Sequence, residues 1–317
     1  MVNVSIILTT YNHKEFIWEA INSIINQSFL NRKLFIWDDS PNEDTWNAIS
    51  PFLHNTKIHA WHHKENKWII ENMNFLIDKV DKNDFVVFLE WDDVLVPDYI
   101  EKKLEIFEKF PEVNLVYNNL DFINKDSNII KKDIFGYRHV KTYKNQKIDC
   151  DDFILAKVWP IISRSTIMLR WCVLEVYRPQ SIVANDKKYA ISDYDFAFNV
   201  STENNVYYIE DSLTLYRRHA SNLSAWNINL LKELSLLVEL YFLQWKIKKR
   251  TFEYKVSQNS VLTALMELEK WNKKSAYQYF KHSKLKYNFV LKILTWFLLM
   301  LPKIITMKIL SKLIKRK

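Results

Sequence analysis

Three short polar segments follow apolar runs of the kind that form buried strands. They are Thr9-Thr10-Tyr11-Asn12, Asp38-Asp39 and Glu90-Trp91-Asp92-Asp93. Carboxylates crowded at one site repel each other unless a cation neutralises them. Hard oxygen ligands suit Mg²⁺ or Mn²⁺, ions that commonly join one or two carboxylates to substrate phosphates. Glu90–Asp93 is therefore a candidate metal site, where a cation would stabilise the charge developing on a departing diphosphate.

The same acidic residues have a second interpretation. Asp92 or Asp93 would then only cap the next helix, which is expected to begin near Pro97. A second acidic pair, Asp38-Asp39, ends a different apolar run. Two acidic strand ends favour a shared site over two unrelated helix caps.

The elements that position these segments alternate between strand and helix patterns. Apolar runs typical of buried strands are Val4–Leu8, Leu34–Trp37, Ile58–Trp61, Phe85–Leu89 and Leu115–Tyr117. Helical patterns lie between them, over about residues 15–25, 44–53, 69–80 and 97–110. This order predicts an α/β fold with a Rossmann-like, mainly parallel sheet covered by helices on both faces. Ligands bind beyond the carboxyl ends of such strands, so the three polar segments are expected at one edge.

The second half of the chain is organised differently. Ile161–Met168 is expected as a buried strand interrupted by Ser163-Arg164-Ser165-Thr166. After Trp226 the pattern changes to long helices. We therefore expect an α/β domain over residues 1–224, an α-helical extension over residues 225–286 and a basic amphipathic tail over residues 287–317.

The composition excludes several classes of protein. Of the 317 residues, 48% are hydrophobic and 26% are charged, as in ordinary folded globular proteins. Gly136 is the only glycine, whereas P-loops and dinucleotide-binding loops need several glycines at fixed spacing. The net charge is +8, but six lysines and arginines lie in residues 303–317 without an acidic residue. A nucleic-acid partner is not expected, because it would require a basic face on the folded domain.

The tail predicts a location. Its longest uncharged run, Ile293–Pro302, is well short of the about 20 residues that span a bilayer. Lysines beside an apolar stripe are typical of a helix that lies in the membrane interface. The alternative is a helix packed on the protein or on a dimer partner. No signal peptide is visible at the N-terminus. The expected location is therefore cytoplasmic, peripheral on the inner face of the cell membrane.

Five segments stand out in chain order: Val4–Asn12, Ile36–Ser40, Phe88–Pro97, Ile191–Phe196 and Tyr216–Ser224. Together they resemble the motifs of glycosyltransferase family 2, inverting enzymes with the GT-A fold, in the form found in bacterial surface-glycan assembly. The resemblance covers about residues 1–224.

The resemblance implies roles for the matching residues near the nucleotide. Thr9, Tyr11 and Asp39 should hold the nucleotide base, with Asp39 accepting a hydrogen bond from the ring N–H. Asp38 should belong to the same donor site and support that loop. The donor that the resemblance implies is a nucleotide-diphosphate sugar, and we expect it to be UDP-linked.

The resemblance also implies roles around the diphosphate. Glu90, Asp92 and Asp93 should hold Mg²⁺ or Mn²⁺, and Asp92 should also contact the donor. Asp193 should be the general base that activates an acceptor hydroxyl, on a glycan or a lipid-linked saccharide. The late motif contributes residues that contact the diphosphate or close over it: Arg217, Arg218 and His219.

The sequence departs from the family at four positions. The family usually has aspartate where Glu90 stands, and often glutamate where Ser192 stands before the base. In the segment Asn66–Phe75, Trp68 replaces a glycine and Met73 an arginine that often faces the nucleotide. These two replacements bear on which base is bound and on the shape of the donor pocket.

Inverting transfer needs one carboxylate to accept the proton and a counter-charge for the leaving group. Two other classes of function are also compatible with the sequence. A metal-dependent sugar nucleotidyltransferase would release diphosphate, and it normally has a basic, often glycine-rich loop that Thr9–Asn12 lacks. A non-catalytic scaffold of the same fold would bind nucleotide without turnover.

Overall fold

The computed structural model forms two compact units. It describes residues 2–134, 145–155, 163–180, 182–184, 187–189, 192–219, 228–269, 272–283, 295 and 299. The first unit comprises Met1–Asp149, Lys157–Val183 and Ser192–Asn222. The second unit comprises Cys150–Ala156, Ala184–Ile191 and Leu223–Lys317. The predicted domain limits at 224 and 286 stay predictions.

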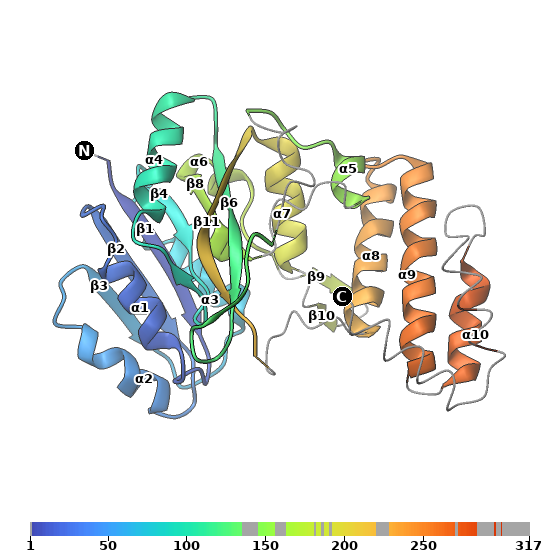
Figure 1. Ribbon diagram of the computed structural model, residues 1–317, viewed down its shortest axis with the longest axis horizontal. Helices are drawn as coiled ribbons and strands as arrows, with labels where there is room; N and C mark the ends of the chain where they lie inside the picture. The colour runs from blue at the N-terminus through green and yellow to red at the C-terminus, as the bar shows by residue number, and fades with distance from the viewer. Residues whose placement is uncertain are drawn as a thin grey trace. The chain divides into compact units, whose positions relative to one another are not determined.

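One large sheet organises the first unit (Figure 1). Its strand order among the described residues is β3-β2-β1-β4-β8-β6-β11-β5, with β7 beside β6. The strands are β1 (Val4–Thr10), β2 (Arg32–Asp38), β3 (Ile58–His62), β4 (Phe85–Phe88), β5 (Val94–Leu95), β6 (Leu115–Ile123), β7 (Ile129–Lys131), β8 (Ile167–Arg170) and β11 (Val206–Arg217). Two short strands, β9 (Ile182–Ala184) and β10 (Lys187–Tyr189), pair apart from it.

Parallel pairing brings the three polar segments to one edge, as predicted. β1 runs parallel to both β2 and β4. Thr10 pairs with Asp38 in one ladder, and Ile7 pairs with Phe88 in the other. Because all three strands point the same way, the loops that follow them lie next to one another.

Helices cover both faces of this sheet, which confirms the predicted α/β class. Successive residues of a strand point to opposite faces. Ile36 belongs to the apolar cluster that includes residues of α1, α2 and α4. Trp37 lies on the other face, where its ring is 4.3 Å from Phe75 of α3. The covering helices are α1 (Ile17–Ile25), α2 (Asp44–Ile49), α3 (Ile69–Ile77) and α4 (Tyr99–Lys109), with a 3₁₀ turn η1 (Ser50–Phe52) after α2.

The expected strand Ile161–Met168 starts later than predicted. β8 begins at Ile167, after a 3₁₀ turn η3 (Arg164–Thr166). Ser163 caps this turn by accepting a hydrogen bond from the Ser165 N–H, and such local side-chain bonds compete with strand pairing. β8 also runs antiparallel to β4 and β6, between which it lies. α6 (Trp171–Val176) follows it directly.

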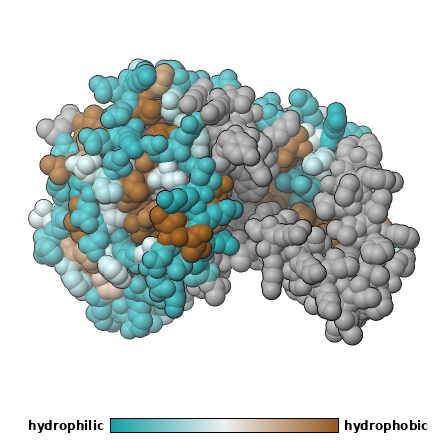
Figure 2. Space-filling view, in the orientation of Figure 1, coloured by the Kyte–Doolittle hydropathy of each residue, from teal (hydrophilic) through white to brown (hydrophobic). Residues whose placement is uncertain are grey.

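The surface of the first unit is mainly hydrophilic on the face that Figure 2 presents, with separate apolar areas. Large hydrophobic side chains that are exposed include Trp18 on α1 and Ile129 and Ile130 on β7. Singly exposed apolar side chains are normal on soluble proteins.

The second unit is helical. α8 (Ile228–Leu243), α9 (Lys249–Glu269) and α10 (Lys273–His282) follow one another, and α9 packs on both of the others. α5 (Cys150–Ile154) docks on α9, where Asp151 accepts a hydrogen bond from the Lys248 N–H at 3.0 Å. Within the described residues, no helix is both long and apolar enough to cross a membrane. The predicted tail lies outside the described residues except for Thr295 and Leu299.

Candidate active site

Asp39 lies at the end of β2, where a neighbouring segment fixes its carboxylate. It is buried, and its Oδ2 accepts hydrogen bonds from the Lys67 N–H at 3.0 Å and the Asn72 side chain at 2.6 Å. Thus the segment that precedes α3 and the first turn of α3 hold the residue that is predicted to read the nucleotide base. That assignment stays a prediction.

Trp68 lies between these two anchors and has an unusual backbone conformation. Its φ is 72°, in the left-handed region that favours glycine. The family that the sequence resembles has glycine at this position, so the turn is retained although the residue differs. A bulky residue with positive φ costs on the order of 1–3 kcal/mol and persists only where its surroundings hold it.

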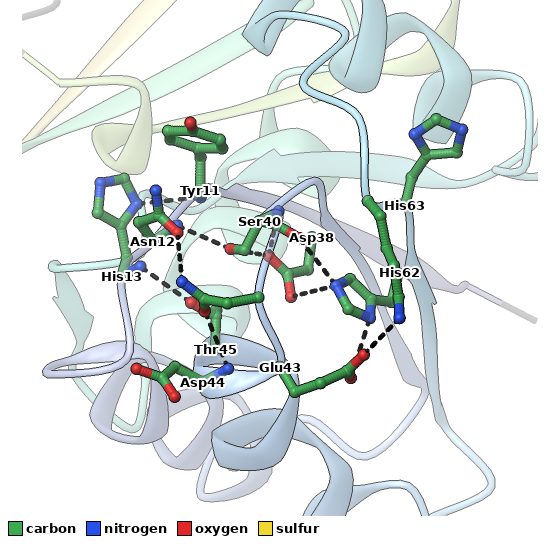
Figure 3. A network of polar contacts seen from close by, with 12 residues as sticks. Tyr11, Asn12, His13, Asp38, Ser40, Glu43, Asp44, Thr45, His62 and His63 are labelled. Atoms are coloured by element: carbon green, nitrogen blue, oxygen red, sulfur yellow. Dashed lines mark hydrogen bonds and ion pairs between the residues drawn. The ribbon is translucent and has the colours of Figure 1, made fainter.

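Asp38 holds the loop after β2 through contacts that Figure 3 shows, while its predicted place in the donor site stays a prediction. It is fully buried, and its Oδ1 accepts hydrogen bonds from both the backbone N–H and the hydroxyl of Ser40. The Ser40 hydroxyl oxygen in turn accepts from the Asn12 N–H at 2.7 Å. Burial raises the pKa of Asp38 above its ordinary value. The carboxylate therefore links the loop after β2 to the loop after β1.

The end of β1 and the loop that follows it carry the other two predicted base contacts. Thr9 is buried, whereas Tyr11 is exposed. Asn12 has φ 57°, and the next residue, His13, donates its N–H to the Thr45 hydroxyl of α2 at 3.1 Å. These contacts fix a tight turn that leaves the Tyr11 ring accessible to a ligand.

His62 is the last residue of β3 and His63 follows it, and the two side chains diverge in Figure 3. His62 is mostly buried, with Nε2 3.8 Å from Asp38 Oδ2 and Nδ1 3.5 Å from Glu43 Oε2. His63 turns away from this network. His62 thus helps to hold the loop after β2 and does not form a metal pair with His63.

The acidic segment after β4 contains a tightly packed pair. Asp92 is nearly buried, and its Oδ2 lies 2.9 Å from His219 Nε2. Burial, and next the charge of Glu90, raise the pKa of Asp92 to about 7. α4 begins only at Tyr99, so neither Asp92 nor Asp93 caps it. The capping alternative is therefore wrong.

Asp93 occupies an interior position. It is fully buried, with Oδ2 accepting from the Ser163 hydroxyl at 2.8 Å and Oδ1 accepting from the Arg217 N–H at 3.2 Å. Burial, and next the charge of Asp92, raise the pKa of its carboxyl well above the ordinary value. These contacts tie the acidic segment to η3 and to the end of β11.

Arg164 joins two of the predicted site residues. Its Nε donates to Glu90 Oε1 at 2.7 Å, and its Nη1 lies 2.6 Å from Asp193 Oδ1. Asp193 stands at the start of α7 (Ser192–Glu203), with 55% of its side chain exposed. The fold therefore brings Asp193, the predicted base, close to Glu90 of the predicted metal segment, although the two residues are about a hundred positions apart in the chain.

Sequence reasoning did not assign a role to Arg164, although a signal was present. An arginine inside an otherwise apolar predicted strand must be paired if it is buried. Its partners could not be found from sequence, because Glu90 and Asp193 lie far from it along the chain.

Arg217 is fully buried and holds several segments together. Its guanidinium donates to the carbonyls of Asp92, Asn124 and Lys125, and it pairs with Glu19 at 2.9 Å. Its predicted contact with the diphosphate remains untested. Arg218, next to it, is exposed.

Across the described part of the chain, no three His, Cys, Asp or Glu side chains are arranged as a ready metal site. Glu90, Asp92, Asp193 and His219 nevertheless lie in one connected network through Arg164 and the acidic segment. The arrangement can place a proton acceptor beside a site for a charged leaving group.

Two curated relatives are similar to the chain in sequence. The chain is 24% identical to an uncharacterised glycosyltransferase of Haemophilus influenzae, over 85% of this chain and 82% of that protein. It is 30% identical to the UDP-Glc:alpha-D-GlcNAc-diphosphoundecaprenol beta-1,3-glucosyltransferase WfaP of Escherichia coli, over 39% of this chain and 47% of WfaP.

Solved structures share the fold. Residues 1–349 of Staphylococcus aureus TarS in complex with UDP-GlcNAc superpose with a TM-score of 0.60 at 12% identity, covering 99% of this chain and 92% of that one. In another structure of TarS with a longer chain, the match covers only 52% of that chain. The mannosyltransferase PcManGT of Pyrobaculum calidifontis, in complex with GDP-Man and Mn²⁺, has a TM-score of 0.58 at 14% identity, covering 98% and 85%. These likenesses confirm the predicted GT-A fold.

The family follows from a sequence match that covers the strand ends and η3 of this site, and that ends before Asp193 and the late motif. Residues 5–168 of the 317 match Glycosyl transferase family 2. The matched region includes all three strand ends and η3 with Arg164. The chain therefore belongs to glycosyl transferase family 2, enzymes that transfer a sugar from a nucleotide-sugar donor.

Proposed function

We propose that the protein transfers a sugar, with inversion, from a UDP-sugar to a hydroxyl of a lipid-linked glycan. One observation carries this proposal: Arg164 holds the exposed Asp193 beside Glu90, at the edge where the strand ends meet. A UDP-sugar and a lipid-linked acceptor are supported by the reaction in the name of WfaP and by the UDP-GlcNAc bound to TarS.

The reaction would be a single displacement. Asp193 accepts the proton of the acceptor hydroxyl while its oxygen attacks the anomeric carbon. The bond from that carbon to the diphosphate oxygen breaks on the opposite face, so the centre inverts and a nucleoside diphosphate leaves. A retaining double displacement would need a nucleophilic carboxylate, by analogy with glycosidases. Asp193, paired to Arg164 and more than half exposed, suits a base.

The nucleotide would be held by the carboxyl ends of β1 and β2 and the loops that follow them. We assign base contacts to Thr9, Tyr11 and Asp39. Tyr11 is exposed in a loop that hydrogen bonds hold in place, so its ring offers a stacking surface. Asp38 takes the supporting role, through Ser40.

The acidic segment has the donor chemistry that Mg²⁺ or Mn²⁺ requires. These ions are commonly held by one or two carboxylates together with substrate phosphates. Asp92 and Glu90 form such a pair, close enough for the charge of Glu90 to raise the pKa of Asp92. A cation bound there would supply the counter-charge for the leaving diphosphate. Asp93, being fully buried, would contribute by fixing the segment.

His219 and Arg217 would act around the diphosphate. His219 contacts Asp92 directly and stands at the start of the late motif, so we assign it to the donor site. Arg217 donates a hydrogen bond to the Asp92 carbonyl, and it would thereby stabilise the acidic segment of the diphosphate site.

The larger organisation is part of the proposal. We assign donor binding and catalysis to residues 1–224, a helical extension to residues 225–286, and attachment to the inner membrane surface to residues 287–317. The support for the last assignment is the run of apolar residues and lysines in that tail.

The decisive experiment replaces Asp92 with Ala and measures sugar transfer and UDP binding with Mn²⁺. Loss of the carboxylate should remove most activity and weaken UDP binding only when the metal is present, because the metal would bridge the two. Asp126→Ala, at an exposed turn after β6, is the matched control and should behave like the wild type.

Three outcomes would count against the proposal. Full wild-type activity in EDTA together with normal turnover of Asp92→Ala would remove the metal assignment. Release of diphosphate, with the nucleotide joined to the sugar, would indicate a nucleotidyltransferase. Nucleotide binding without turnover of any acceptor would indicate a scaffold.

A further inference from the structure

Arg164 is a buried cation shared by two carboxylates. Its side chain is only 5% exposed, and burying a guanidinium is costly unless charged partners compensate it. Glu90 and Asp193 are those partners, at 2.7 Å and 2.6 Å. The two carboxylates belong to different elements, so the arginine sets the separation between them.

The turn that carries Arg164 is itself anchored to the acidic segment. Ser163 donates its hydroxyl to Asp93, and the Ser165 hydroxyl oxygen accepts from the Glu90 N–H at 3.0 Å. Thr214 of β11 also donates to the Ser165 carbonyl at 3.0 Å. The residues on both sides of Arg164 are thus fixed to the segment that its guanidinium contacts, which leaves little freedom for the side chain.

The third contact of the guanidinium is with Met73. Arg164 Nη1 lies 3.8 Å from the Met73 sulfur on α3. Met73 stands where the family segment carries an arginine, as noted from the sequence. The two side chains are therefore close enough for a guanidinium on residue 73 to occupy the space that the Arg164 guanidinium fills.

We propose that Arg164 is the positioning residue of this active site. Its guanidinium orients the base Asp193 and fixes Glu90. The cation thus comes from η3, whereas an arginine at residue 73 would supply it from α3. The inference rests on the proposed inverting transfer. By holding Asp193 Oδ1, Arg164 leaves Oδ2 to accept the acceptor proton, in the way that a third group orients the base in other enzymes.

The first test compares Arg164→Met with Arg170→Met. Arg170 ends β8 and binds the carbonyls of Val113 and Phe107, so its loss is a matched structural control remote from Asp193. Arg164→Met should lower kcat by about 10²-fold, the cost of a base misplaced by about 1 Å. KM for the donor should change by less than about threefold, and UDP binding should persist. Arg164→Lys should retain an intermediate kcat, because lysine keeps the charge without the planar fork.

The second test moves the guanidinium. The double variant Met73→Arg/Arg164→Met should recover at least about tenfold in kcat over Arg164→Met, since the charge returns to the same space. A kcat for Arg164→Met no lower than that of Arg170→Met would overturn the inference. So would a double variant with no recovery whose fold and UDP binding are intact.

A third measurement does not depend on turnover. If Arg164 holds Asp193, the thermal-midpoint losses of Arg164→Met and Asp193→Asn should not add, and the double variant should be as stable as Arg164→Met alone. Additive losses would overturn the inference, even for variants with no measurable activity. A wild type that transfers no sugar would count against the proposed function, whereas an active wild type with a fully active Arg164→Met would count against Arg164 alone.

Discussion

Asp193 and Asp195 lie two residues apart at the start of α7, yet their side chains meet different partners. Asp193 pairs with Arg164 beside the acidic segment. Asp195 Oδ1 instead accepts from the Asn199 side chain at 3.1 Å, one turn further along the same helix. Residues two apart on a helix point about 200° apart, so only one of the two can face the site.

This difference predicts unequal effects of the same substitution. Asp193→Asn keeps the shape of the side chain but removes the proton acceptor, so turnover should fall by about 10²–10⁴-fold with donor binding nearly unchanged. Asp195→Asn is the matched control and should do much less. Steady-state transfer and UDP binding, measured on both variants, check this. A larger loss for Asp195→Asn would assign the base to Asp195.

At the scale of elements, a buried lysine joins α4 to the sheet. Lys103 is fully buried, and its ammonium group donates to the Thr166 carbonyl at 2.6 Å and the Val116 carbonyl at 3.3 Å. It also lies 4.0 Å from the centre of the Tyr99 ring. α4 is thereby held against β6 and against η3, the turn that carries Arg164.

Burial holds the pKa of Lys103 well below the ordinary value of 10.5. Between the lowered pKa and 10.5 the unfolded chain binds more protons than the folded one, so folding stability rises with pH across that window. Lys103→Met lacks this contribution. Relative to the wild type, its free energy of unfolding should therefore fall as the pH rises within that window.

Denaturant unfolding at several alkaline pH values below 10.5 measures this change in the free energy of unfolding. Lys102→Met is the matched control, since Lys102 is partly exposed and pairs with Asp98 and Asp211 at the surface. The difference in free energy of unfolding between Lys102→Met and the wild type should stay constant over the same pH range. A pH-independent difference for Lys103→Met would mean that Lys103 titrates alike in the folded and unfolded chain.

At the scale of the whole molecule, the prediction concerns location. Deleting residues 288–317 should release the protein from membranes and leave donor binding intact, because every assigned donor residue precedes residue 220. Burying the apolar residues between 293 and 299 in an interface contributes several kcal/mol, at about 25 cal/mol per Å². The lysines add a part that salt screens. High salt should therefore weaken membrane association without abolishing it.

Sedimentation with anionic vesicles, with and without the tail, measures this association. The truncated enzyme should still bind UDP, yet transfer poorly to a lipid-linked acceptor in vesicles. Equal sedimentation of both forms would show that the tail is not the anchor. Loss of the fold, or dissociation of a dimer, would instead support the alternative that the tail packs on protein.

The sequence alone determined the parallel half of the sheet and which polar segments meet at its edge. Continuous apolar runs such as Val4–Leu8 and Phe85–Leu89 can only be buried on both faces, which requires parallel strands covered by helices. Parallel strands end together, so the polar segments at Tyr11, Asp39 and Asp92 had to meet. These inferences depend on local pattern and on a general rule of sheet geometry, and the structure agrees with both.

Only the tertiary structure decided how the site is held together. The antiparallel placement of β8 between β4 and β6 brings η3 onto the acidic segment, and no periodicity in the sequence specifies that order. It is this placement that joins Arg164 to Glu90 and Asp193 and buries Asp93. Ion pairs between residues about 30 and 70 apart in the chain depend on the three-dimensional register of separate elements, which local patterns do not encode.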